Sequence, residues 1–121
     1  MPDELTHAIL GSAIEVHRIL GPGLLESIYE EALCEELGQR GIPFRRQVAV
    51  DVWYKDKVIK GQRLDLLVNE EVIVEIKSLS VMPEYVTAQA LSYLKATGLK
   101  RALIINFGQK TLIKGVRRIS L

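Results

Sequence analysis

Residues 62–79 read QRLDLLVNEEVIVEIKSL, and this stretch decides the fold that we expect for the chain. Apolar and polar residues alternate on both sides of residues 69–71, which predicts two strands joined by a tight turn. The alternation assigns two sets of residues to opposite faces of the first strand: Leu64, Leu66 and Val68 to one, Arg63, Asp65 and Leu67 to the other. Glu75 and Lys77 share a face of the second strand, and Asp65 can share it if the two strands pair.

A cluster of Asp65, Glu75 and Lys77 among valines, isoleucines and leucines is energetically costly. Two like charges about 4 Å apart repel by about 4 kcal/mol at an effective dielectric near 20, and charged side chains are rarely buried unless they are paired. Two explanations are open. Lys77 bridges the two acids in an internal ion pair, or Asp65 and Glu75 hold a divalent metal ion with Lys77 beside it. Spacing alone does not separate them.

The composition bounds the class of protein. The chain has 121 residues, enough for one domain, and 48% of them are hydrophobic and 26% charged, which is typical of a soluble globular protein. The net charge of +1 is no signature of nucleic-acid binding, so any basic surface has to be local. Two arginine pairs, Arg45-Arg46 and Arg117-Arg118, are the candidates for nucleic-acid contacts, with solvated surface arginines as the alternative.

Cysteine usage and the N-terminal residues indicate a cytoplasmic protein. Cys34 is the single cysteine, which excludes an internal disulfide and every zinc site built from several cysteines. Asp3 and Glu4 stand where a signal peptide would be basic. The apolar runs are too short to span a membrane, and we therefore expect a reducing, cytoplasmic location without a membrane partner.

Helical and extended patterns surround the central stretch. Apolar residues at three- and four-residue spacing predict helices over 3–20, 24–40 and 83–97. Alternation and β-branched residues predict strands over 44–54, 58–68, 72–77, 101–107 and 111–119. Asp3 is a predicted N-cap, and Gly61 is predicted to mark a bulge or bend. The order of elements is α-α-β-β-β-α-β-β.

Two helices carry further polar candidates. Glu26 lies near the edge of the apolar stripe of helix 24–40, beside Tyr29; the alternative is a solvated acid that complements the helix dipole. Gln89 and Tyr93 stand at i and i+4 on helix 83–97. Gln89 can point at the end of the strand that carries Glu75 and Lys77, although a surface glutamine is the simpler interpretation.

The chain resembles a known family. Gly23-Leu24-Leu25-Glu26-Ser27-Ile28-Tyr29 fits the pattern that names the GxxExxY protein family, and the resemblance covers nearly the whole chain. It continues in Gly41-Ile42-Pro43-Phe44, Asp65, Val74-Glu75-Ile76-Lys77, Gln89, Tyr93-Leu94-Lys95-Ala96-Thr97-Gly98 and Ile105-Asn106-Phe107-Gly108. That family is placed in the PD-(D/E)XK, or restriction-endonuclease-like, superfamily. The resemblance implies a single domain over 1–121 of the α/β (α+β) class, with a mixed central β-sheet flanked by helices.

The resemblance also implies a metal-dependent nuclease. Asp65, Glu75 and the backbone carbonyl of Ile76 would hold Mg²⁺ or Mn²⁺, and Lys77 would be catalytic. Glu26 and Gln89 would be further catalytic residues, with Tyr93 aiding Gln89. The sequence departs from the usual motif at Leu64, where many members of the superfamily have a proline before the aspartate.

The implied partner is nucleic acid, and a homodimer would join two small basic patches. Two other functions stay open on sequence alone. One is a non-catalytic nucleic-acid or protein interaction module on the same fold, which the near-neutral net charge favours. The other is hydrolysis of a phosphodiester outside nucleic acid.

Overall fold

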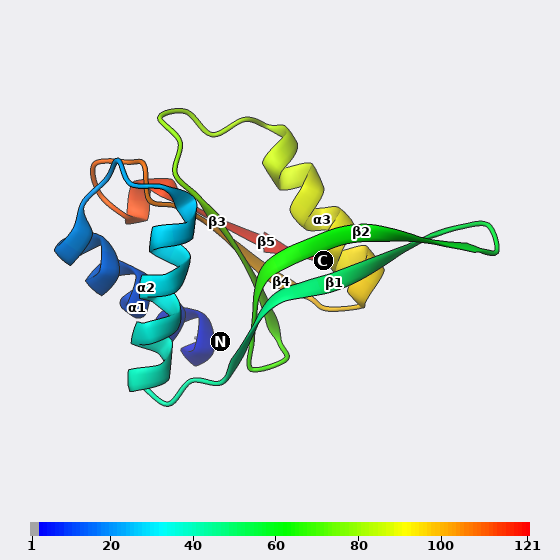
Figure 1. Ribbon diagram of the computed structural model, residues 1–121, viewed down its shortest axis with the longest axis horizontal. Helices are drawn as coiled ribbons and strands as arrows, with labels where there is room; N and C mark the ends of the chain where they lie inside the picture. The colour runs from blue at the N-terminus through cyan, green and yellow to red at the C-terminus, as the bar shows by residue number, and fades with distance from the viewer. Residues whose placement is uncertain (1–2) are drawn as a thin grey trace.

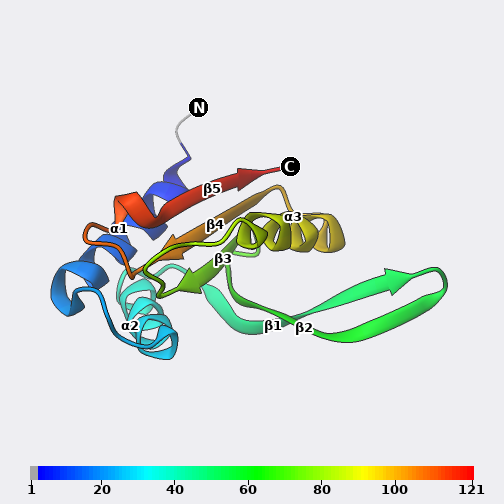
Figure 2. The same cartoon turned by 90° about the horizontal axis from the view of Figure 1, so that it is seen from above.

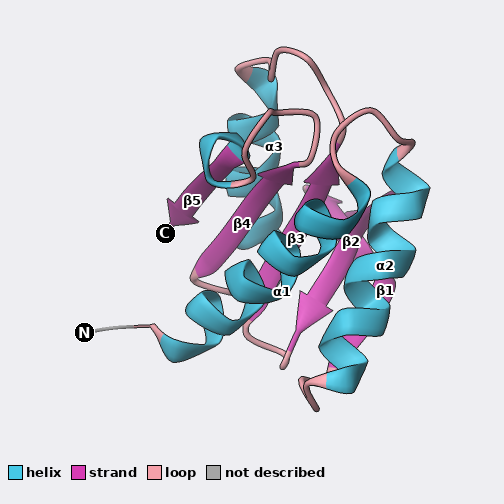
Figure 3. Cartoon of the chain, turned by 90° about the vertical axis from the view of Figure 1, so that its left-hand side faces the viewer, coloured by secondary structure: helices cyan, strands magenta, loops and turns pink. Residues whose placement is uncertain are grey.

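The computed structural model describes residues 3–121 as three layers, with a five-stranded sheet in the middle. Two helices cover one face and a third covers the other, as Figure 3 shows with α1 and α2 in front of the sheet and α3 behind it. The elements in chain order are α1 (Glu4–Leu20), α2 (Glu26–Gln39), β1 (Phe44–Tyr54), β2 (Lys57–Val68), β3 (Val72–Lys77), α3 (Tyr85–Thr97), β4 (Arg101–Asn106), the 3₁₀ turn η1 (Ile113–Gly115) and β5 (Val116–Ser120). The fold class and the order of helices and strands are confirmed. Residues 1–2 of the predicted domain lie outside the described part.

The sheet has the strand order β1-β2-β3-β4-β5. β3 and β4 are parallel and the other neighbours are antiparallel. α3 is the crossover between the two parallel strands, which places it on the face opposite α1 and α2 (Figure 1). Within residues 3–121, no helix is long and apolar enough to cross a membrane.

Each face of β3 packs on a different helical layer. Val72, Val74 and Ile76 lie in the core with α1 and α2, whereas Ile73 packs with Tyr93 and the rest of the core under α3. Alternation then directs Glu75 and Lys77 to the α3 side of the sheet. The predicted hairpin of 62–79 is confirmed, with its turn at 69–71.

One predicted face is wrong. Leu66 lies in the core under α1 and α2, but Leu64 lies in the core under α3, so the two leucines do not share a face. The alternation breaks at Asp65 and at Gln47, its neighbour on β1. Gln47 has a φ of 51°, a left-handed conformation that is uncommon for a residue other than glycine. This local turn of the ribbon reverses the faces of both strands.

The distal half of the β1–β2 hairpin leaves the sheet and extends away from the body of the molecule (Figures 1 and 2). Val50 pairs with Gln62 but Val52 pairs with Ile59, so β2 carries one extra residue there. Gly61, with a φ of 122°, provides the backbone conformation for this bulge, as predicted.

Three predicted starts move by two residues or more, one of them that of α3, which begins at Tyr85 and not at Pro83. α2 begins at Glu26 and not at Leu24, because Leu25 is still extended with a ψ of 151°. The last strand begins at Val116 and not at Thr111, because η1 precedes it. Gly115 approaches the Asn106 carbonyl so closely that a Cβ there would lie 2.1 Å from the oxygen, which leaves no room for a side chain at this turn.

Candidate active site

The structure brings Asp65 and Glu75 together at the point where β2 and β3 cease to pair. The last paired residues are Leu66 and Val74. Beyond them, the carboxylates accept the hydrogen bonds of the opposite backbone. The Asp65 N–H donates to Glu75 Oε2 at 2.7 Å, and the Ile76 N–H donates to Asp65 Oδ2 at 2.7 Å. The two acids therefore form one reciprocal unit between the strands.

This environment disfavours the charged form of both acids. Glu75 is only 4% exposed. Burial and then the charge of Asp65 raise its pKa from 4.5 to about 7, against the opposing effect of the Asp65 N–H. Burial also raises the pKa of Asp65, although the hydrogen bond from Ile76 opposes the shift. A cation close to these carboxylates would favour their charged form.

Each carboxylate keeps one oxygen for an outside partner. Asp65 Oδ1 and Glu75 Oε1 accept no hydrogen bond from residues 3–121. No buried side-chain polar atom of this part of the chain lacks a partner, so neither oxygen is sealed off from solvent. The Ile76 carbonyl points to the same side as its N–H, toward Asp65, as strand geometry requires.

Carboxylate and carbonyl oxygens are the ligands that a hard divalent cation prefers. Mg²⁺ binds through one or two carboxylates and retains several waters. Across the described residues there is no group of three or more His, Cys, Asp or Glu side chains placed to hold a metal. A cation here would therefore take its protein ligands from Asp65, Glu75 and the Ile76 carbonyl and fill its other positions with water or substrate.

Lys77 lies at the carboxyl end of β3 without a bridging ion pair. No ion pair among residues 3–121 involves it. Its charge nevertheless lowers the pKa of both Asp65 and Glu75. The internal salt bridge, one of the two explanations for the cluster, is not observed.

The segment before α2 closes over this end of β3. Ser78 Oγ donates to the Leu24 carbonyl at 2.6 Å. The Tyr29 hydroxyl donates to the Gly21 carbonyl and accepts from the Leu24 N–H, while its ring stacks on Phe107 with centroids 4.5 Å apart. Tyr29 thus fixes the chain that leads into Glu26.

Glu26, the first residue of α2, is exposed and makes no side-chain hydrogen bond within the described chain. Its charge still raises the pKa of both Asp65 and Glu75. The side chain is therefore open to solvent, as expected for a solvated acid of the first helical turn. Its charge also acts on the two acids, as expected for a residue of the site.

α3 contributes Tyr93 more clearly than Gln89. The Tyr93 hydroxyl donates to the Arg63 carbonyl at 3.2 Å, and burial and then the charges of Glu75 and Asp65 raise its pKa. Gln89 is half-buried one turn earlier on the same side of α3. No hydrogen bond joins Gln89 to the acids in the region described.

Sequence reasoning missed Glu30 as part of this region. Arg46 donates to Glu30 Oε2 at 2.8 and 3.1 Å, and Gln47 Nε2 donates to Oε1 at 3.0 Å. The charge of Glu30 raises the pKa of Asp65. The available signal was its spacing, because Glu30 follows Glu26 by four residues on the same side of the helix.

The four arginines predicted to contact nucleic acid lie on the two opposite edge strands, β1 and β5. Arg45 pairs with Glu70, and Arg46 pairs with Glu30 and Glu31. Arg117 donates to the Met82 carbonyl at 3.1 Å and to Thr87 Oγ1 at 3.0 Å.

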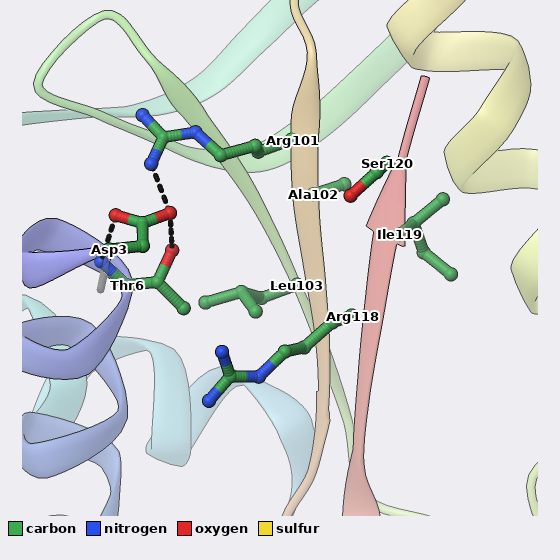
Figure 4. Close-up of a pocket in the computed structure, with 8 residues that line it drawn as sticks. All are labelled: Asp3, Thr6, Arg101, Ala102, Leu103, Arg118, Ile119 and Ser120. Atoms are coloured by element: carbon green, nitrogen blue, oxygen red, sulfur yellow. Dashed lines mark hydrogen bonds and ion pairs between the residues drawn. The ribbon is translucent and has the colours of Figure 1, made fainter. Parts of the chain in front are cut away.

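Arg118 is exposed and lines a cavity of about 100 Å³ with Asp3, Thr6 and Arg101, where Arg101 pairs with Asp3 (Figure 4). Arg101 begins β4 and pairs with Val72, so this cavity lies at the end of the sheet opposite Lys77. The four arginines form no common surface.

Comparison with known families gave one finding. A family model described as the PD-(D/E)XK nuclease superfamily matches residues 3–119. Comparisons with curated proteins and with solved structures gave no significant match. The match spans nearly all of the sequence, including the strands that carry Asp65, Glu75 and Lys77. The chain belongs to the PD-(D/E)XK nuclease superfamily.

Proposed function

We propose that the chain is a metal-dependent nuclease of the GxxExxY family, which hydrolyses phosphodiester bonds of nucleic acid with Mg²⁺ or Mn²⁺. One observation carries the proposal. Asp65 and Glu75 meet at a break in strand pairing with one unbonded oxygen each, beside a lysine that no carboxylate of residues 3–121 pairs with. Family membership supplies the expected class of reaction.

The roles follow from the chemistry of the side chains. Asp65, Glu75 and the Ile76 carbonyl would hold the metal. A divalent ion held there would supply polarisation of the scissile phosphate and a bound water of lowered pKa. Lys77 orients the attacking water and stabilises negative charge that develops on the phosphate.

Glu26 and Gln89 act around this centre. Glu26 is open to solvent and would act through a water bound to the metal. Gln89 helps to position the nucleophile from α3. Tyr93 holds the backbone of β2 at Arg63, two residues before Asp65, and so keeps the aspartate in place.

The test is a nuclease assay on single- and double-stranded DNA and RNA, with Mg²⁺, Mn²⁺ or EDTA. We expect metal-dependent cleavage of at least one substrate and a loss of at least about 10³-fold in Glu75→Gln, because the metal supplies several kcal/mol. Glu70→Gln is the matched control, since it removes the same charge from an exposed acid on the hairpin turn. Equal cleavage by wild type and Glu75→Gln would contradict the proposal.

The competing function is a non-catalytic interaction module on the same fold. The net charge of +1 and the internal partners of Arg45, Arg46 and Arg117 favour it. This function predicts no cleavage with any metal, and equal binding of nucleic acid or protein by wild type and Glu75→Gln.

A further inference from the structure

The distal part of the β1–β2 hairpin, residues 51–61, is here called the arm. It projects from the body with neither face covered by another element of the described chain (Figures 1 and 2). Trp53 is 67% exposed and Tyr54 61% exposed. Val52 and Ile59 are exposed as well. A two-stranded hairpin is only marginally stable alone, so this arm presents costly apolar surface without a packing role in the domain.

The arm also carries a small excess of positive charge. Residues 51–61 contain three lysines against two aspartates, a net charge of +1. Lys60 is bound by Asp51 at 2.9 Å. Lys55 and Lys57, at the turn, pair with no carboxylate among residues 3–121, and the Lys55 ammonium lies 5.5 Å from the centre of the Tyr54 ring.

We propose that the arm holds the nucleic-acid substrate, an inference that rests on the proposed function. Lys55 and Lys57 contact phosphates, and Trp53 and Tyr54 stack on bases or sugars. Cationic and aromatic side chains together are the combination that binds nucleic acid through its backbone and the faces of its bases. A second copy of the chain fits less well, because it would bring two positive arms together.

The arm and the metal-binding aspartate belong to the same strand, which fixes the register of the substrate. Lys57 lies eight residues before Asp65 on β2, which spans at most about 27 Å because the strand is bulged at Gly61. At 3.4 Å per nucleotide along a strand, the tip contacts the substrate at most about eight nucleotides from the cleaved bond. A two-stranded ribbon also has dimensions that the major groove of a duplex admits.

The first test measures binding in EDTA, with fluorescein-labelled single- and double-stranded oligonucleotides. We expect Lys55→Ala/Lys57→Ala to weaken binding about tenfold. The slope of log K against log salt should fall by about 1.8 on duplex DNA or about 1.4 on a single strand, because two phosphate contacts are lost. The control is Lys100→Ala/Lys114→Ala, which removes the same charge from exposed lysines on the body. Equal effects of the two double variants would overturn the proposal.

The second test uses Trp53, which is the only tryptophan in the chain. An oligonucleotide that extends ten nucleotides to either side of its centre should quench the fluorescence of Trp53. An oligonucleotide that extends only four nucleotides to either side should quench it much less. Quenching by neutral vesicles, or by raising the protein concentration without oligonucleotide, would overturn the proposal in favour of a membrane or a second copy. Neither assay measures cleavage, so absent nuclease activity would refute the proposed function without altering these results.

Discussion

Two groups of acids lie side by side in this molecule and differ in how their charge is balanced. The arginine-paired cluster consists of Glu30, Glu31 and Arg46, and the guanidinium donates to both carboxylates at 2.8–3.1 Å. The unpaired cluster consists of Asp65 and Glu75, whose carboxylates accept hydrogen bonds only from backbone N–H groups within residues 3–121. One cluster contains its cation, and the other does not.

The difference separates acids that stabilise the fold from acids that we propose to bind a metal. The arginine-paired cluster joins α2 to β1, and Arg46 supplies the positive charge that its acids require. The unpaired cluster is buried deeply enough to raise the pKa of Glu75 to about 7, yet it keeps two oxygens that accept no hydrogen bond within residues 3–121. Acids held in such an unfavourable state are concentrated at functional sites. An external cation bound there would relieve this cost.

The largest expected effect is on the pH dependence of stability without metal. The pKa of Glu75 is about 7 in the folded protein and 4.5 for the free side chain, so the folded state binds its proton more tightly. The contribution to the free energy of unfolding is then full below about pH 4.5 and is lost as the pH rises to about 7. For Glu75 alone it amounts to roughly 3 kcal/mol.

Urea unfolding in EDTA between pH 4.5 and 8 measures this effect. Wild type should lose stability relative to Glu75→Gln across the interval, and the two curves should run parallel above pH 8. Asp65, whose pKa is also raised, acts in the same direction. A wild type that instead gains stability over this range relative to the variant would mean that the chain does balance the charge of the unpaired cluster.

The next effect is stabilisation by metal. A cation that binds only the folded protein stabilises it by about 2.7 kcal/mol at one hundred times its Kd. For a domain of this size we expect a rise in Tm of about 10 °C with Mg²⁺ or Mn²⁺ at pH 8. The rise should be absent in Asp65→Asn/Glu75→Gln.

Thermal melts of the two proteins, with and without metal, separate the metal site from an internal ion pair. Without metal, the double variant should be at least as stable as wild type, because it retains the backbone hydrogen bonds and loses the repulsion. An ion pair to Lys77 predicts the opposite, since neutral partners would leave a buried ammonium alone. A destabilised double variant beside a wild type indifferent to metal would support the interaction module.

Much of the fold could be predicted because its signals are local. Alternation in 62–79, the glycines after α1 and α3, and the apolar spacing of the helices specify elements whose order is confirmed. The same alternation predicted that Glu75 and Lys77 share a face. These features depend on residues close in sequence, so the printed chain contains them.

The remaining features depend on partners far apart in sequence. Nothing local indicates that Gln47 adopts a left-handed conformation, which reverses the faces of Leu64 and Leu66. Arg46 reads as a surface cation until α2 brings Glu30 to it across 16 residues. The catalytic roles of Lys77, Glu26 and Gln89 stay predictions, because these roles depend on a bound substrate.

The smallest effect concerns the arginine-paired cluster and has the opposite sign. Glu30→Gln removes a charge that Arg46 and Gln47 both bind, so it should destabilise the metal-free protein by about 1–2 kcal/mol at pH 8. The figure is below that of a fully buried pair, because the Arg46 side chain is 37% exposed and keeps Glu31. Glu75→Gln at the same pH should not destabilise the protein.

Glu70→Gln is the control for the arginine-paired cluster. Both side chains of the Arg45–Glu70 pair are more than half exposed, so this substitution should leave the stability of the protein unchanged.

Glu30→Gln should have one further consequence. The charge of Glu30 raises the pKa of Asp65, so removing that charge should lower the pKa of Asp65. The pH range in which the free energy of unfolding of the variant falls should then move to lower pH. Urea unfolding of the three variants measures both changes. Destabilisation of equal size and sign by Glu30→Gln and Glu75→Gln would show that the two clusters have the same role, and the contrast between structural and functional acids would then be wrong.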